Sequence, residues 1–205
     1  EEILSLLDDP WVEMAEIRLD RCNLSRQETE DLFSETDTPL IATCRISEVG
    51  AKESERRLGL AIRSGARFAD LEIEADVAYS KRFRSMCEEC GTEIIRSFHD
   101  FKGTPDLEYL RQVRDRCYRY GADIAKVVTT AQSEEDASRI LALYDDSEGG
   151  LVAFAMGAAG RRTRIACLKA GAPFSYAALS GDNAAAPGQI EYLAMHKEVY
   201  GGFRG

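Results

Sequence analysis

The sequence predicts an α/β protein of the (β/α)8 barrel class, and three observations support this fold. First, apolar runs rich in β-branched residues alternate with helix-like segments at a repeat of about 27 residues. Second, the first run is followed by Arg21-Cys22-Asn23-Leu24, not by the Gly-rich turn of an open doubly wound sheet. Third, polar residues recur where the runs end, as they do at the carboxyl ends of barrel strands.

Seven apolar runs are the expected strands. They cover residues 14–19, 40–45, 68–73, 93–99, 122–128, 151–156 and 174–179. Between them, Ser25 and Glu28 have the spacing of a capping box, and Ser133 precedes an acidic first turn. Thr104-Pro105 places a proline in the first turn of another helix. Helix ends are expected at Gly65, Gly91, Gly121 and Gly171.

The opening residues, 1–7, have the amphipathic pattern of a helix. In a strand–helix repeat such a helix follows a strand, so we expect the first barrel strand to lie upstream of Glu1. Residues 1–205 are expected to form a single catalytic barrel domain.

Composition excludes several classes of protein. The net charge of −10 and the pI of about 4.8 argue against a nucleic-acid or anionic-membrane surface. No apolar run approaches the roughly 18 residues of a membrane span, and no signal peptide is visible. Six scattered cysteines in apolar patterns favour a reduced, cytoplasmic protein. Cys87 and Cys90 form a lone CxxC, which could be half of a zinc site or a redox pair, but no second pair and no histidine at ligand spacing accompanies it, so no metal is expected.

Two strands carry residues that a buried strand does not ordinarily contain. His99 closes the run 93–99, and Lys126 lies inside the run 122–128. Lysine is almost never fully buried without a partner or a function. Loss of hydration favours the neutral amine, which is a nucleophile that can form a Schiff base with a ketone. A histidine one repeat away is the natural proton carrier.

Charged residues on the first two strands suggest a binding pocket. Glu16, Arg18 and Asp20 alternate, so they share one face of a strand, where three charges are costly unless paired. They form either a structural ladder or a functional set. Arg45 ends the next strand and, beside Arg18, would complete a cationic pocket for a polyhydroxy or anionic ligand.

Later segments add further candidates. Glu72 and Glu74 share a strand face, and structural pairing with arginine or lysine is the favoured role. The loop 156–164 contains Gly157 and Gly160 and ends in Arg164, which suggests a site for a carboxylate or phosphate on helix-end N–H groups. Residues 183–189 resemble a mobile active-site loop, and His196 is interpreted as structural.

Taken in order, these motifs resemble type I 3-dehydroquinate dehydratase. The motifs are E-x-R-x-D, T-C-R, D-L-E-I-E, S-F-H-D-F, D-I-A-K, M-G-x-x-G-x-x-x-R and A-P-G-Q, and they run from about residue 16 to residue 189. Each motif alone is weak, but all seven occur in the family's order. The resemblance implies a (β/α)8 barrel and a hydro-lyase that uses a Schiff-base lysine on the shikimate pathway of aromatic amino-acid biosynthesis.

The resemblance also assigns roles to individual residues. Lys126 matches the Schiff-base lysine, and His99 matches the proton donor and acceptor. The remaining matches bind substrate, at its hydroxyls and pocket walls or at its carboxylate: Glu16, Arg18 and Arg45, then Arg164 and Gln189. Two positions depart from the family. Ala185 stands where a serine is usual, and Glu48 lies three residues after Arg45, where a His-orienting glutamate usually lies four residues on.

The resemblance implies syn dehydration of 3-dehydroquinate to 3-dehydroshikimate, with no cofactor and with a homodimeric assembly. Two alternatives stay open from the residues themselves. One is a class I aldolase-type barrel that forms its Schiff base with a sugar phosphate bound at Gly157–Gly160. The other is a barrel without catalytic activity that binds a metabolite or a partner.

Overall fold

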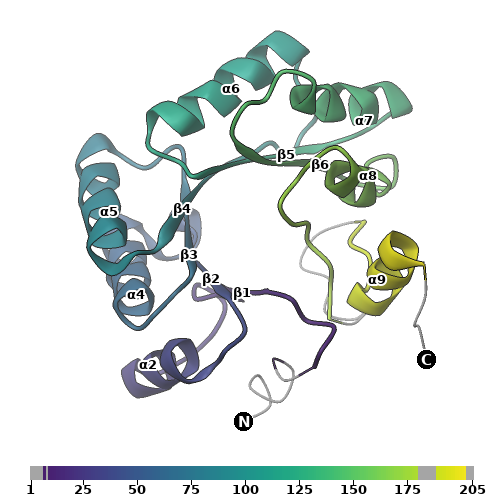
Figure 1. The fold of residues 1–205 in the computed structure, drawn as a ribbon. Helices are drawn as coiled ribbons and strands as arrows, with labels where there is room; N and C mark the ends of the chain where they lie inside the picture. The colour runs from purple at the N-terminus through teal and green to yellow at the C-terminus, as the bar shows by residue number, and fades with distance from the viewer. Residues whose placement is uncertain (1–6, 8, 180–187, 202–205) are drawn as a thin grey trace. The chain divides into compact units, whose positions relative to one another are not determined.

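A computed structural model describes residues 7, 9–179 and 188–201 of the chain. Strands and helices alternate along it (Figure 1). The strands are β1 (Ala15–Arg18), β2 (Leu40–Thr43), β3 (Phe68–Glu72), β4 (Glu93–His99), β5 (Ile124–Thr130) and β6 (Gly150–Met156). The helices are α2 (Arg26–Glu35), α3 (Ile46–Val49), α4 (Ala51–Arg63), α5 (Val77–Cys90), α6 (Leu107–Arg119), α7 (Glu134–Leu141), the 3-10 helix η1 (Ala142–Tyr144), α8 (Thr163–Lys169) and α9 (Tyr192–Tyr200). Six of the seven expected strands are therefore confirmed.

The chain divides into two compact units, Glu1–Ser97 with Arg119–Asp123, and Phe98–Tyr118 with Ile124–Gly205. The strands follow one another in the sheet in the order of the sequence, and the pairs with a defined register are parallel. The single catalytic domain over residues 1–205 stays a prediction, and so does a strand upstream of Glu1. The helix expected at 1–7 lies outside the described residues, apart from Leu7.

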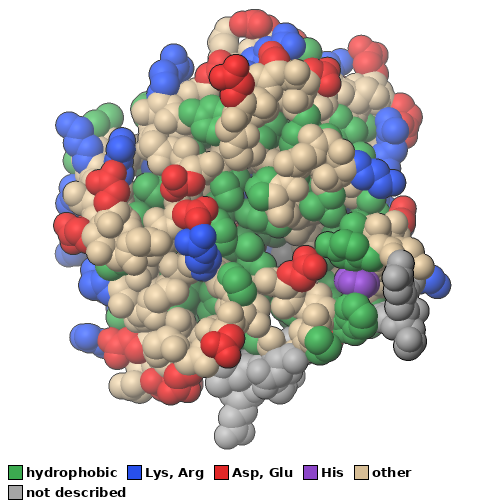
Figure 2. Space-filling model, in the orientation of Figure 1, with side chains coloured by type: hydrophobic (Ala, Val, Ile, Leu, Met, Phe, Trp, Pro, Cys, Tyr) green, Lys and Arg blue, Asp and Glu red, His purple; other side chains and the backbone are tan. Residues whose placement is uncertain are grey.

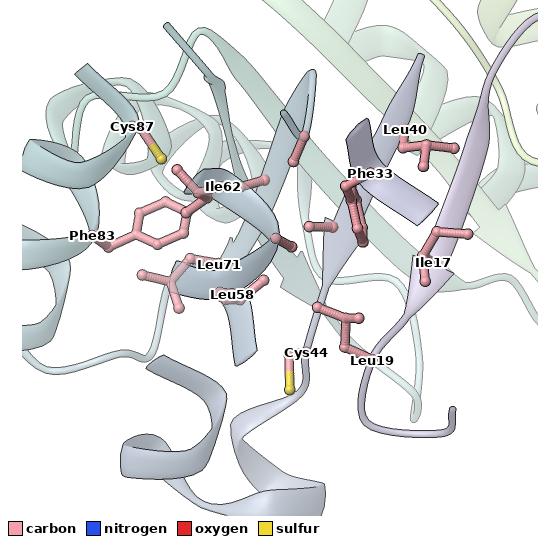
Figure 3. Close-up of a cluster of buried hydrophobic side chains, with 14 of the residues drawn as sticks. Ile17, Leu19, Phe33, Leu40, Cys44, Leu58, Ile62, Leu71, Phe83 and Cys87 are labelled. Carbon is pink, nitrogen blue, oxygen red and sulfur yellow. The ribbon is translucent and has the colours of Figure 1, made fainter. Parts of the chain in front are cut away.

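The core of the first unit lies between its strands and the helices that cover them (Figure 3). Alternation along β1 sends Ile17 toward the helices, whereas Glu16 and Arg18 are on the opposite face. Helix α4 contributes Leu58 and Ile62, four residues apart and so on one helix face, and both are fully buried. Strand β2 is buried along its whole length, so it is covered on both faces, as parallel strands usually are.

In the second unit, β5 and β6 pair in register over all seven residues of each strand. Lys126 lies opposite Val152, and Val128 lies opposite Phe154. Partners in a parallel pair point to the same face of the sheet, as do residues two apart along a strand. Lys126, Val128, Val152 and Phe154 therefore share one face, and this face carries the candidate site.

The prediction of a seventh strand at residues 174–179 is wrong. Its only ladder contact within the described residues is an isolated bridge between Ala178 and Glu191. The edge of β6 is occupied by side chains instead of by a strand. The Tyr144 hydroxyl accepts the Ala153 N–H at 2.7 Å, and the Thr163 hydroxyl accepts the Ala155 N–H at 2.8 Å. Because these hydroxyls satisfy the backbone groups of β6, no strand is needed there to pair with them.

Most helix boundaries follow the expected signals. Ser25 and Glu28 form the capping box of α2, and the Ser133 hydroxyl accepts the Asp136 N–H to cap α7. The four glycines expected at helix ends all have positive φ: Gly65, Gly91, Gly121 and Gly171. Helix α6 begins after Pro105, and its cap is the Asp106 carboxylate, which accepts the Tyr109 N–H at 2.9 Å. The proline therefore precedes the helix and does not lie in its first turn.

Acidic and basic side chains are interspersed on the face that Figure 2 shows, and they do not form separate fields. Ion pairs such as Arg82–Glu55 and Arg84–Glu88 are exposed enough to contribute little stability each. In the described part of the chain, no helix is long and apolar enough to cross a membrane.

Candidate active site

Lys126 lies in the middle of β5 with only 3% of its surface exposed. Its amine nitrogen is 4.2 Å from the centre of the Tyr176 ring, within the range of a cation–π interaction. Burial removes water from the amine, and the ring presents its electron-rich face to it. The structure therefore holds this lysine inside the protein, as the sequence predicted, and does not release it to the surface.

His99 ends β4 on the same face of the sheet as Lys126. The Asp100 N–H donates to the Val128 carbonyl at 2.8 Å, the bond that sets residue 99 opposite residue 128 in a parallel ladder. Lys126 is two residues before Val128, so it is a diagonal neighbour of His99. Strand spacing and rise place their Cα atoms about 8 Å apart, and both side chains can reach one small ligand.

The segment after His99 is fixed by polar contacts. The Asp100 carboxylate accepts the N–H groups of Lys102 and Gly103 at 2.8 and 3.1 Å, and the Thr130 hydroxyl donates to the Asp100 carbonyl at 3.1 Å. The Phe101 ring, 72% exposed, stacks on the imidazole with 5.9 Å between ring centres. These contacts hold the imidazole in one place at the end of its strand.

Arg164 is a buried cation on the first turn of α8, with 1% of its surface exposed. Its guanidinium lies 4.5 Å from the centre of the Phe154 ring and donates through Nη1 to the Tyr176 carbonyl at 3.3 Å. Among the described residues no carboxylate pairs with it, and its Nε has no hydrogen-bond partner. Burial lowers the pKa of Arg164 to about 10. An uncompensated buried guanidinium is suited to bind an anion that enters from outside.

Gln189 is brought to this cluster by two glycines that touch. Gly188, with φ of 76°, packs so closely that a Cβ on it would lie 2.6 Å from the carbonyl oxygen of Gly157 at the end of β6. Only glycine fits there. The next residue, Gln189, donates from its side-chain amide to the Ala177 carbonyl at 3.1 Å, beside Tyr176. Residues 180–187, which include Ala185 and most of the predicted loop, lie outside the described residues.

The first unit contains a second polar cluster, in which the arginines already have carboxylate partners. Arg18 makes a two-pronged contact with Asp20, with distances of 3.0 and 2.5 Å. Burial alone would raise the pKa of Asp20, but the hydrogen bonds and charge of Arg18 outweigh it and lower that pKa. The sequence analysis placed Asp20 on the strand, but β1 ends at Arg18 and Asp20 lies in the turn that follows. Glu16 accepts the Thr43 hydroxyl at 2.9 Å.

Arg45 lies after β2 ends and is the N-cap residue of the short helix α3. Its guanidinium donates to Glu72 at 3.3 Å and to Ser97 at 3.4 Å, and its backbone N–H donates to Asp20 at 3.2 Å. The structural role expected for Glu72 is thus confirmed, and Glu72 also accepts the Ile46 N–H at 2.8 Å. These carboxylates fix the start of α3.

Glu48, the candidate for orienting His99, is an exposed residue on α3. Its charge helps to raise the pKa of Arg18. It belongs to the first unit and His99 belongs to the second, so the role expected for Glu48 stays a prediction.

The anion site expected on the backbone at residues 156–164 stays a prediction. Two N–H groups at the start of α8 are already used, because Thr163 donates to Gly160 at 2.8 Å and Arg164 donates to Arg161 at 3.3 Å.

The sequence also missed three residues of these clusters. The Tyr176 ring contacts the Lys126 amine, and the Phe154 ring contacts the Arg164 guanidinium. Asp70, buried on β3, accepts the Ser97 hydroxyl at 2.5 Å. Phe174 and Tyr176, two positions apart in the run 174–179, were a signal for Tyr176, but the run was interpreted only as a strand.

Cys87 is buried in α5 and Cys90 is exposed, and neither forms a disulfide. Burial raises the pKa of Cys87 to about 12, so this thiol is a poor metal ligand and a poor nucleophile. Within the described ranges no group of three His, Cys, Asp or Glu residues could hold a metal ion.

The fold and these clusters define an α/β protein with a buried strand lysine and a buried arginine, both of which contact Tyr176. The type I 3-dehydroquinase family profile matches residues 2–200, and the chain belongs to this family. It is 36% identical over 198 residues to a 3-dehydroquinate dehydratase of Methanococcus maripaludis strain C5, covering 91% of this chain and 86% of that protein.

Solved structures confirm the fold class. The 3-dehydroquinate dehydratase of Geobacillus kaustophilus HTA426 is 28% identical, with a TM-score of 0.79 over 92% of this chain and 79% of that one. The type I 3-dehydroquinate dehydratase of Clostridium difficile is 20% identical, with a TM-score of 0.86 over 97% of this chain and 85% of that one. The (β/α)8 class is therefore confirmed, with six of its strands within the described residues.

Proposed function

We propose that this chain is a 3-dehydroquinate dehydratase that removes water from 3-dehydroquinate through a Schiff base on Lys126. The proposal rests on one observation in a member of this family: two buried cations, Lys126 and Arg164, both contact Tyr176. The Lys126 amine lies over the Tyr176 ring, and the Arg164 guanidinium, which has no carboxylate partner among the described residues, donates to the Tyr176 carbonyl.

The first chemical step joins the amine to the ketone. The lone pair of the neutral Lys126 amine attacks the carbonyl carbon. The oxygen then leaves as water, taking one proton from the nitrogen and one from the surroundings. The product is an iminium ion, whose positive charge draws electrons from the adjacent carbon and makes the C–H bond there more acidic.

His99 carries the proton in the next step. Its imidazole takes the proton from the carbon next to the iminium, which leaves an enamine. The enamine electrons then expel the hydroxyl group, which takes the proton from the imidazolium and leaves as water. Hydrolysis of the resulting conjugated iminium frees Lys126 and the enone product. The diagonal placement of His99 and Lys126 supports one residue serving both proton transfers on one side of the ring.

Arg164 is proposed to bind the substrate carboxylate, with Gln189 beside it. A single uncompensated guanidinium matches a carboxylate, which has one charge and two oxygens. A sugar phosphate would need more donors, and two of the backbone N–H groups at the start of α8, those of Thr163 and Arg164, are already occupied. This observation favours the carboxylate over the aldolase-type alternative.

Glu16, Arg18 and Arg45 are proposed to bind the substrate hydroxyls and line the pocket, as the family resemblance implies. Their internal partners support this role in preference to anion binding. Because Arg18 pairs with Asp20 and Arg45 pairs with Glu72, they present hydrogen-bond donors without a large net positive charge. A cytoplasmic location and a homodimer remain our predictions.

Trapping with borohydride tests the Schiff base. The protein is incubated with 3-dehydroquinate, reduced and digested, and the mass increase should lie on the peptide with Lys126. Lys126→Ala should lose the adduct, whereas Lys102→Ala, at an exposed lysine of the same unit, should keep it. Absence of an adduct on Lys126 in the unmodified protein would rule out the mechanism.

Ultraviolet absorbance of the conjugated enone follows turnover. His99→Ala should still form the adduct but lose turnover by about 10²- to 10⁴-fold, the usual contribution of a general acid–base residue. Near-normal turnover in this variant would show that another group moves the proton.

A further inference from the structure

Two buried cations share one face of the second unit, and each lies on an aromatic ring. The Lys126 nitrogen is 4.2 Å from the centre of the Tyr176 ring, and the Arg164 guanidinium is 4.5 Å from that of Phe154. The rings themselves are 5.9 Å apart. The mechanism above gives neither ring a role.

We propose that the face of the Tyr176 ring stabilises the cationic forms of Lys126, which are the ammonium before attack and the iminium after it. The iminium half of this proposal rests on the proposed function. Ammonium and ketone convert to iminium and water with no change in net charge, so the nitrogen carries a positive charge on both sides of this equilibrium. A ring that attracts a cation can therefore act in both states.

Burial creates the need for such a group. Loss of hydration helps the neutral amine to form, but the same loss penalises the iminium that follows. An aromatic ring has no net charge, so it stabilises the cation and leaves the positive field of Arg164 available to the ligand.

The surroundings fix the ring in position. The Tyr176 carbonyl accepts the hydrogen bond from Arg164 at 3.3 Å, and Phe174 packs against the Tyr176 ring with 5.7 Å between centres. His99 at the end of β4 and Arg164 on α8 are two charged or titratable groups of this unit on the same face. On β6, Val152 and Phe154 face the amine's side of the sheet and are apolar.

The test changes the electrostatics of the ring and keeps its shape. Tyr176→Phe is made first, and position 176 then receives phenylalanine with one, two and three ring fluorines by amber suppression. Each fluorine weakens the negative potential over the ring face. Borohydride trapping with 3-dehydroquinate is done at a pH above the pKa of the amine, where the free lysine is neutral and only the iminium is a cation. The equilibrium constant for imine formation should then fall at each step, by about tenfold at three fluorines.

Two controls separate this effect from a loss of packing. Binding of shikimate, a ring carboxylate without a ketone, should change less than twofold across the fluorinated series. Phe174→Leu removes a ring that supports Tyr176 but leaves Tyr176 itself, and it should leave the slope against fluorine number unchanged.

A second measurement does not depend on the substrate. Cyanate carbamylates neutral amines, so its reaction with Lys126 at pH 7 should become several-fold faster as fluorines are added. Exposed Lys102 in the same sample should react at a constant rate. If wild-type protein traps no dehydroquinate but carbamylation follows the fluorine number, the proposed function fails and the role of the ring stands for the ammonium. A flat response in both measurements overturns the role of Tyr176.

Discussion

At the scale of single residues, Arg164 is placed for binding at the expense of stability. Its guanidinium is buried, and no carboxylate of the described residues faces it, so burial lowers its pKa from 12.5 to about 10. A shift of this size corresponds to a cost on the order of 3 kcal/mol at neutral pH. The folded protein carries this cost until a ligand supplies the missing charge.

Arg164→Leu should therefore stabilise the ligand-free protein. We expect the free energy of unfolding in urea to rise by about 1–3 kcal/mol, because an apolar side chain replaces an unpaired buried charge. Shikimate should raise the melting temperature of the wild type and not that of the variant. Arg162→Leu is the control, since Arg162 is exposed and pairs with Glu134, and its stability should change by less than about 0.5 kcal/mol. A variant that loses stability would mean that Arg164 is a structural residue.

At the scale of elements, the short helix α3 depends on carboxylates from other segments. Asp20 accepts the backbone N–H of Arg45, and Glu72 accepts that of Ile46, so both acids cap the start of this helix. Asp20 also holds Arg18. One buried carboxylate thus fixes the end of β1 and the beginning of α3.

Asp20→Asn should cost about 2–4 kcal/mol of stability at pH 7, because Arg18 keeps its charge and loses its partner. The pKa of Asp20 is lower in the folded protein than in the unfolded chain. Its contribution is therefore complete above the unfolded pKa of about 3.9 and is lost as pH falls through the lower, folded value. Urea unfolding from pH 7 to pH 2.5 should show the difference between wild type and variant shrinking below about pH 4. A difference that is constant across this range would exclude a charge effect.

The edge of β6 is a second feature at this scale. The Tyr144 hydroxyl accepts the Ala153 N–H and lies 3.2 Å from the Ala153 carbonyl, so one phenol occupies both backbone groups of this residue. Tyr144→Phe keeps the ring and leaves these groups without that partner. We expect a loss of about 1–3 kcal/mol and faster hydrogen exchange at the Ala153 amide. Tyr109→Phe, at an exposed tyrosine, should change neither quantity.

At the scale of the whole molecule, the sequence predicted the features that depend on residues close together in the chain. Apolar, β-branched runs located β4 and β5, and with them His99 and Lys126, because nearly every residue of a buried strand must be apolar. The cap of α2 needs only Ser25 and Glu28, three residues apart, so it was also predictable.

What the sequence did not predict depends on contacts between distant segments. Residues 174–179 have the composition of a strand, but Tyr144 and Thr163 already fill the edge of β6, and no local pattern contains that information. The role of Tyr176 was missed for the same reason, since it arises from an amine fifty residues earlier in the chain. The pairing of Arg45 with Glu72 was anticipated only as one of several options.

The six cysteines give a prediction for the molecule as a whole, because all are free thiols with very different exposure. In the native protein, exposed Cys90 should react rapidly with a thiol reagent and half-buried Cys22 slowly. The other four are buried, and burial raises the pKa of Cys44 to about 11. Mass spectrometry of pulse-labelled protein should show them unmodified until urea is added, after which six labels appear. Rapid native labelling of Cys44, Cys87, Cys117 or Cys167 would contradict the described core.

The hydroxyls along β6 also bear on how the protein behaves at high concentration. A terminal strand with free amide and carbonyl groups is a template onto which a strand of another molecule can add, and such additions grow into fibrils. Tyr144 and Thr163 close that template from within the chain, without a charged or proline residue on the strand. Solutions of the Tyr144→Phe protein should accordingly form thioflavin-positive aggregates sooner than the parent under the same agitation.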